Sequence, residues 1–162
     1  MDFPILARIY ESRIVPYIVT PKAAAPAFFD KLNPRVALLS LTPGMRGQIL
    51  AAYFNCNDAV VLSGYGSGGV PEGEYYGFYD VLSAWSGKGK TLVVTTQVAH
   101  EGSDMSVYQV GRELKSRFDL LEGFALTNEA IITKLMWCMG QTNDHEKIKE
   151  LFFTTVNYDR IG

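Results

Sequence analysis

The sequence predicts an α/β fold of the flavodoxin or Rossmann type, a three-layer sandwich around a parallel sheet of about four strands. From residue 35 onward, short apolar runs rich in β-branched residues alternate with helical patterns of about ten residues. That alternation is typical of βαβ units. Two of the apolar runs stop abruptly, one in a glycine-rich loop and one in a loop of hydrogen-bonding side chains. In open α/β sheets, ligands bind beyond the carboxyl ends of the strands.

Strands are predicted where apolar residues run together, and helices where they recur every three or four positions. The predicted strands are residues 35–41, 59–62, 92–96 and a short extended piece at 124–126. The predicted helices are residues 45–54, 73–86, 105–117 and 144–152, with a further helix that starts after Thr127.

Local signals support the first and the fourth of these five helices, counted along the chain. Pro43 suits the turn that opens the first helix. Its inner face is expected to carry four apolar side chains, Ile49, Leu50, Tyr53 and Phe54. Thr127 can cap the fourth helix, and Glu129 in its first turn complements the helix dipole.

The first 34 residues do not follow this rhythm. Residues 5–10 and 14–20 look extended, residues 21–26 look like a linker, and a short helix is expected around Phe28. Compact domains seldom open with so much loosely specified chain. We therefore predict that residues 1–34 are a linker or strap between domains of a larger protein, and that residues 35–162 form the α/β domain.

Composition excludes several classes of function. The net charge of −2 gives no basic footprint for nucleic acid or for an anionic membrane. No apolar run approaches the roughly 20 residues that span a bilayer, and the amino terminus lacks the basic region of a signal peptide. A cytoplasmic location is expected. Cys56 and Cys138 lie in apolar settings and predict two buried, reduced thiols. With only two histidines besides, His100 and His145, a zinc site would lack ligands, and we expect none.

The glycine-rich loop holds five glycines in residues 64–73. A phosphate cradle is one interpretation, because exposed amides at a helix start attract anions. A sharp turn is the other. The spacing fits neither dinucleotide nor nucleotide motifs, no Lys or Arg occurs between Arg46 and Lys88, and Glu72 and Glu74 would repel an anion.

The second loop, after the strand at 92–96, also allows more than one interpretation. It can be a cap and turn network in which Ser103 or Asp104 caps a helix that starts at Met105. It can instead hold a catalytic Ser103–His100–Asp104 set, although Ser103 is not in a GxSxG elbow. A metal site at His100 and Glu101 is the weakest alternative.

Five segments in order, residues 39–45, 61–71, 93–97, 108–111 and 127–135, together resemble the L-asparaginase family. The resemblance is to the carboxyl-terminal domain of its bacterial type I, cytoplasmic branch. Residues 3–7 are similar to the family's linker before that domain. The match covers nearly the whole chain.

The resemblance implies an amidohydrolase that converts L-asparagine to L-aspartate and ammonia without a metal or organic cofactor. In this family the nucleophilic threonine lies in an amino-terminal domain whose motifs are absent here, so the chain alone should be inactive. The resemblance also implies a homodimer or homotetramer in which this domain completes the active site of the neighbouring protomer. Ser67, Gly69 and Glu101 are the substrate-binding positions that it would contribute.

Two departures from the family pattern concern the predicted sites. The family usually has asparagine where this chain has Gly69, so Ser67 is expected to replace that contact. Family members regulated by asparagine have an arginine at the position of Ser63 and a cysteine after Gln97, where this chain has Val98. The effector site implied at Ser63, Gln97 and Val98 is therefore altered.

Two other functions stay open. An asparaginase-like component of an archaeal-type tRNA-dependent amidotransferase would share this fold. A stand-alone module that binds a small amino acid or mediates oligomerisation belongs to a different class. Three aromatic residues follow the glycine loop, Tyr75, Tyr76 and Tyr79. They are expected either to form a contact between protomers or, in the case of at least two of them, to pack in the core.

Overall fold

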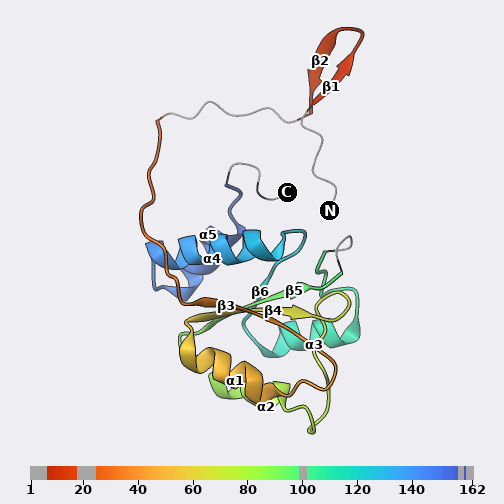
Figure 1. Ribbon diagram of the computed structural model, residues 1–162, viewed down its shortest axis with the longest axis vertical. Coiled ribbons are helices and arrows are strands. Elements are labelled where there is room, and N and C mark those ends of the chain that lie inside the picture. Colours follow the sequence, from red (N-terminus) through yellow and green to blue (C-terminus); the bar gives the residue numbers. More distant parts are fainter. Residues whose placement is uncertain (1–6, 18–24, 99–101, 157–158, 160–162) are drawn as a thin grey trace.

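The computed structural model describes residues 7–17, 25–98, 102–156 and 159. Its centre is a four-stranded sheet in the order β3 (Val36–Ser40), β4 (Ala59–Gly64), β5 (Thr91–Thr96) and β6 (Leu121–Glu122). All neighbouring pairs are parallel. Helices cover both faces of the sheet (Figure 1), and the predicted three-layer α/β fold is confirmed.

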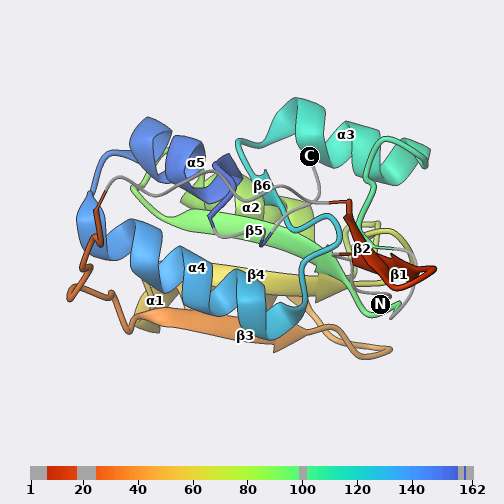
Figure 2. The same cartoon turned by 90° about the horizontal axis from the view of Figure 1, so that it is seen from above.

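Within the described residues, three helices lie on one face of the sheet and two on the other. α1 (Gly47–Cys56), α2 (Phe78–Trp85) and α3 (Gln109–Arg117) share a face, and α4 (Asn128–Gln141) and α5 (His145–Phe153) cover the opposite one (Figure 2). Strand β4 divides the core accordingly, because successive side chains of a strand point to opposite faces. Val60 and Leu62 pack with α1 to α3, whereas Val61 packs with α4 and α5.

Several predicted boundaries were wrong, and local backbone conformation explains most of them. α2 begins at Phe78 and not at residue 73, because Gly73 and Gly77 have φ of +97° and +67°, which a helix does not allow. The short strand is β6 at 121–122 and not at 124–126, where Phe124 has φ of +49°. On α1, Ile49 is 45% exposed and does not belong to the inner face.

The cysteine prediction was half right. Cys56 and Cys138 are both free, but Cys56 is exposed because it ends α1, whereas Cys138 lies on α4 and is buried in the core. Burial raises the pKa of the Cys138 thiol to about 11. That thiol therefore stays protonated near neutral pH and is inert.

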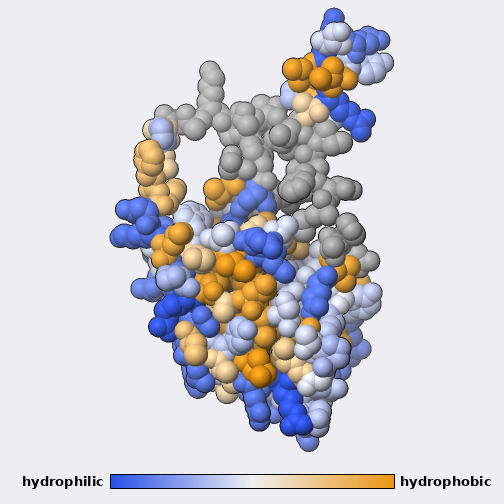
Figure 3. Space-filling view, in the orientation of Figure 1, coloured by the Kyte–Doolittle hydropathy of each residue, from blue (hydrophilic) through white to orange (hydrophobic). Residues whose placement is uncertain are grey.

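The amino-terminal segment forms a hairpin of β1 (Ala7–Tyr10) and β2 (Arg13–Pro16). The extended conformation that we predicted there is confirmed within the described residues. Ile9 and Ile14 face each other across the hairpin and are 79% and 72% exposed, and apolar surface is visible there in Figure 3. Two strands alone are marginally stable in water, so this face would gain from a covering partner.

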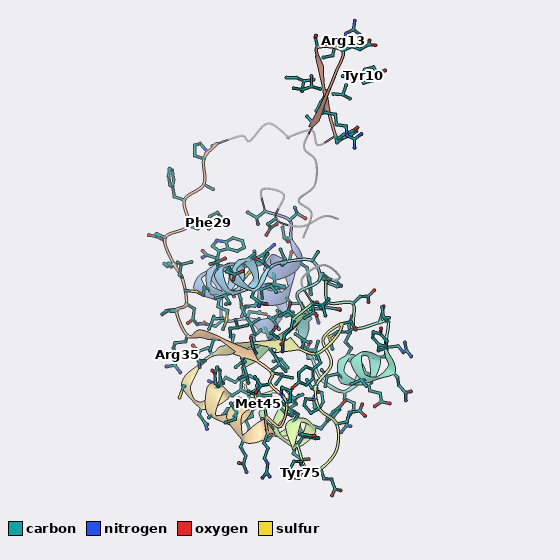
Figure 4. The ribbon with its side chains drawn as sticks, turned by 45° about the vertical axis from the view of Figure 1, so that its right-hand side comes forward. Tyr10, Arg13, Phe29, Arg35, Met45 and Tyr75 are labelled. Carbon is teal, nitrogen blue, oxygen red and sulfur yellow. The ribbon has the colours of Figure 1, made fainter. Side chains whose placement is uncertain are left out.

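Residues 25–34, which we call the strap, pass the carboxyl-terminal end of α4 without forming the helix expected around Phe28. The ring centroids of Phe29 and Trp137 are 5.4 Å apart, edge to face, and Figure 4 shows Phe29 beside the helices. The Asn33 backbone N–H donates to the Met136 carbonyl at 2.9 Å. The strap thus docks on α4, and its role between domains stays a prediction.

Replacing Gly140 by alanine is expected to release the strap from α4. A methyl group there would lie 2.2 Å from the Lys31 carbonyl oxygen, so the strap must move. The helix itself gains up to about 1 kcal/mol in propensity. Limited proteolysis should show faster cleavage within residues 25–34, while the thermal midpoint of the domain stays nearly constant. Thr133→Ala, on an exposed part of α4, is the control, and equal cleavage of both variants would contradict the docking.

Candidate functional site

The glycine loop, residues 64–71, leaves the carboxyl end of β4 and folds back on itself. Tyr65 and Gly69 form an antiparallel bridge, with Tyr65 N–H donating to the Gly69 carbonyl at 2.9 Å and Gly69 N–H to the Tyr65 carbonyl at 2.7 Å. Gly66 and Gly68 have φ of +51° and +110°, which glycine adopts without strain. These hydrogen bonds within the loop support the sharp turn and not the phosphate cradle.

The polar loop, residues 97–104, of which the structure describes 97–98 and 102–104, follows the adjacent strand β5 and contacts the glycine loop where it begins. The Thr96 hydroxyl donates to the Gly66 carbonyl. The Gln97 backbone N–H donates to the Gly64 carbonyl at 3.2 Å. The two loops that the sequence placed at one edge of the sheet therefore lie side by side.

The Gln97 side chain ties three strand ends together. Its Nε2 donates to the Leu41 carbonyl at 2.8 Å and to the Ser63 carbonyl at 3.0 Å. Leu41 follows β3 and Ser63 belongs to β4. The side-chain amide nitrogen of Gln97 thus serves the scaffold of the site.

A cavity of about 450 Å³ opens between this edge and the start of α4. Its lining combines strand ends with the first residues of α4, namely Ser40, Ser63, Thr95, Thr96, Gln97, Val98, Phe124, Leu126, Thr127, Asn128 and Glu129. Thr127 caps α4 as predicted, since its hydroxyl oxygen accepts from Ala130 N–H at 3.2 Å. Among the described residues of this lining, Glu129 is the one that carries a charge.

The structure brings three of the six predicted site residues together at the cavity. Ser63, Gln97 and Val98 all line the cavity. Ser63 is fully buried, and within the described part of the chain its hydroxyl has no hydrogen-bond partner. Ser67 and Gly69 lie on the glycine loop and are half-buried.

Glu101 and His100 lie outside the described residues. The catalytic and metal-binding interpretations that involve them therefore have no structural description. Ser103, the partner of His100 in the catalytic interpretation, is 1% exposed, and a hydroxyl so buried is poorly placed to attack a substrate from solvent.

The predicted helix start at Met105 was wrong. α3 begins at Gln109, and neither Ser103 nor Asp104 caps it. Asp104 instead closes a turn, with its carboxylate accepting from Ser106 N–H at 2.9 Å. Hydrogen bonds from the side chain and backbone of Ser106 lower the pKa of Asp104.

The aromatic residues after the glycine loop divide as expected. Tyr76 and Tyr79 pack against the core, whereas Tyr75 is 67% exposed. The Arg46 guanidinium stacks 4.4 Å from the centroid of the Tyr75 ring. Figure 4 shows Tyr75 at the end of the molecule opposite the hairpin.

Sequence reasoning missed two residues beneath the loops. Met105 is fully buried and Glu122 is 2% exposed, and the Met105 N–H donates to the Glu122 carboxylate at 2.6 Å. The available signal was Glu122 itself, an acidic residue among the otherwise apolar residues 120–123. A carboxylate buried in such a run needs a hydrogen-bonding or charged partner.

Comparison with known proteins places the chain in a family. The sequence profile described as the glutaminase/asparaginase C-terminal domain matches residues 35–152. The chain belongs to this family. The sheet edge, the loops and the cavity described above therefore belong to an asparaginase carboxyl-terminal domain.

Three relatives show how far the likeness extends. An L-asparaginase of Thermococcus kodakarensis is 38% identical over 128 residues, which are 78% of this chain and 38% of that protein. A glutamyl-tRNA(Gln) amidotransferase component of Metallosphaera sedula is 33% identical over 135 residues, 78% of this chain and 29% of its own length. The solved thermostable L-asparaginase of T. kodakarensis has a TM-score of 0.83 at 30% identity, over 100% of this chain and 49% of that one.

The asparaginase domain described here therefore spans less than half the length of these relatives. The relative at 38% identity is archaeal, so the expected bacterial type I branch stays a prediction. In the described ranges, no three His, Cys, Asp or Glu side chains are grouped so as to hold a metal ion. No helix among the described residues is long and apolar enough to cross a membrane.

Proposed function

We propose that this chain is the carboxyl-terminal half of an L-asparaginase, which hydrolyses L-asparagine to L-aspartate and ammonia. The observation that carries the proposal is the pair of contacting loops at the carboxyl edge of the sheet, in a chain of the asparaginase C-terminal domain family. Ligands of open α/β sheets bind at that edge. The loops would form one wall of the active site of a neighbouring protomer, in a homodimer or homotetramer.

Ser67, Gly69 and Glu101 are the residues we assign to substrate contacts in that wall. Gly69 offers only backbone groups, so a side-chain contact from the glycine loop falls to the Ser67 hydroxyl. The nucleophilic hydroxyl would reside in the other half of the protein and form an acyl-enzyme. In this proposal the chain alone is inert, the enzyme is cytoplasmic, and the apolar face of the β1–β2 hairpin is covered by the other half.

The cavity lined by Ser63, Gln97 and Val98 would lack the usual means of binding an asparagine effector. Among the described residues of its lining, the only charge is the carboxylate of Glu129. An α-carboxylate bound there would meet no cationic side chain from that lining and one like charge, which disfavours it. We therefore propose that free asparagine does not regulate the enzyme through this cavity.

The test compares ammonia release by two proteins at saturating asparagine. One is this chain, and the other is the product of the complete reading frame that contains it. The complete product should hydrolyse asparagine, and the chain alone should be about 10⁴-fold or more slower, since loss of a nucleophile costs at least that much. Turnover by the chain alone at the rate of the complete product would contradict the proposal.

A second candidate follows from the amidotransferase relatives, of which the M. sedula protein is 33% identical to this chain. A protein of that kind would release ammonia for tRNA-linked glutamate. The net charge of −2 gives this chain no basic surface for tRNA, so the other half would have to bind it. Hydrolysis of free asparagine that is independent of charged tRNA favours the asparaginase. A complete frame without a threonine nucleophile segment would favour a stand-alone module.

A further inference from the structure

We infer that Glu122 is a positioning residue that holds the glycine loop and the polar loop in place through the backbone of Met105. The inference rests on the proposed function insofar as those loops contact substrate. Its physical content, a link from β6 to both loops, does not depend on which amide is hydrolysed.

Glu122 is buried and both of its carboxylate oxygens are occupied. Oε1 accepts the Met105 N–H at 2.6 Å, and Oε2 lies 2.8 Å from Lys115 Nζ on α3. The Glu122 side chain is 2% exposed and that of Lys115 is 43% exposed. Charge-assisted hydrogen bonds of this kind are short and strong. One carboxylate therefore joins β6, α3 and the segment that follows the polar loop.

Met105 connects Glu122 to the glycine loop. Its side chain is fully buried. A methyl group built on Gly68 would lie 3.4 Å from Met105 Cγ and 3.1 Å from Val94 Cγ1. The turn of the glycine loop thus rests on Met105 and on β5.

The Met105 backbone and its neighbours also restrain the carboxyl-terminal end of the polar loop. Ser103 N–H donates to the Phe124 carbonyl at 2.9 Å, two residues after Glu122. A methyl group on Gly111 would lie 2.4 Å from the Met105 carbonyl oxygen, so α3 packs directly on this backbone. Gln97 fixes the near end of the loop and Met105 fixes the far end. Removing the Glu122 bond should therefore loosen both loops and leave the sheet intact.

The test measures amide hydrogen exchange in this chain for the wild type, Glu122→Ala, Glu122→Gln and Lys115→Met. In Glu122→Ala we expect exchange of the Met105, Gly68 and Gly69 amides to rise about tenfold or more, with no change in β4 and β5, as in local opening. Glu122→Gln keeps a carbonyl acceptor for Met105 and should give a smaller, several-fold rise. Lys115→Met keeps the Met105 bond and should leave the Gly68 and Gly69 amides unchanged.

Kinetics of the complete enzyme add a readout that loss of stability alone would not produce. We expect Glu122→Ala to raise KM for asparagine about tenfold with kcat changed less than about threefold, and Glu122→Gln to restore most of KM. If the complete protein does not hydrolyse asparagine, the proposed function fails while amide exchange still decides this inference. Unchanged exchange at Gly68 and Gly69 in Glu122→Ala, or a uniform rise across the sheet, overturns it. If Glu122→Ala does not fold, unchanged exchange at these amides in Glu122→Gln overturns it.

Discussion

Gly64→Ala is expected to destabilise the domain by about 1–3 kcal/mol, the usual cost of forcing extra atoms into a packed position. A methyl group on Gly64 would lie 2.5 Å from the Gly69 carbonyl oxygen and 2.9 Å from the Gly68 carbonyl carbon. Both are backbone atoms, so no side chain can rotate away. The bridge between Tyr65 and Gly69 must open, and the glycine loop would leave its place beside β5. Urea denaturation followed by circular dichroism measures the loss of stability.

Gly69→Ala is the matched control, because it adds the same methyl group to the same loop. There the nearest atom, the Tyr65 carbonyl oxygen, would lie 3.4 Å away, which is ordinary contact. Its stability should stay within about 0.5 kcal/mol of wild type. Equal losses in the two variants would show that the bridged turn does not constrain the loop.

The core of the fold could be predicted because apolar periodicity is a local signal. Strands β3 to β5 and helices α1, α4 and α5 lie within a few residues of where the pattern placed them. The errors occur where backbone conformation competes with that pattern. The spacing of Val107, Val110 and Leu114 suggests a helix from Met105, but Val107 is 55% exposed and Met105 is bound to Glu122 instead.

The sequence predicted the edge of the sheet where the site lies, but not the shape or lining of the cavity there. The rule that strand ends gather at one edge brought the glycine loop and the polar loop together. The links that shape the edge join residues far apart in sequence. Gln97 donates to Leu41, 56 positions earlier, and Glu122 accepts from Met105, 17 positions earlier. No local pattern in a single sequence reports such pairs.

The hydrophobic core beneath α4 and α5 gives the other large effect. Phe152→Ala is expected to destabilise the domain by about 3–5 kcal/mol, the range for removing a buried phenylalanine. Phe152 is fully buried on α5 and packs with Ile131, Leu135 and Ile148. The deletion leaves a cavity between two helices and the sheet, and small domains have only about 5–15 kcal/mol to lose. Urea denaturation should give a lower midpoint with an unchanged slope.

Phe28→Ala removes the same ring from the strap, where Phe28 is 90% exposed. Its effect should fall within about 0.5 kcal/mol, the range of ordinary surface substitutions. The contrast between the two phenylalanines tests whether α5 belongs to the cooperative core. α4 is also joined to the end of α5, because Lys134 Nζ donates to the carbonyl of Thr154, the residue after α5, at 2.7 Å. The first turn of α4 lines the cavity, so packing of α5 against α4 supports that side of the cavity. A loss of stability below about 1 kcal/mol for Phe152→Ala, well short of the usual range, would show that α5 does not give this support.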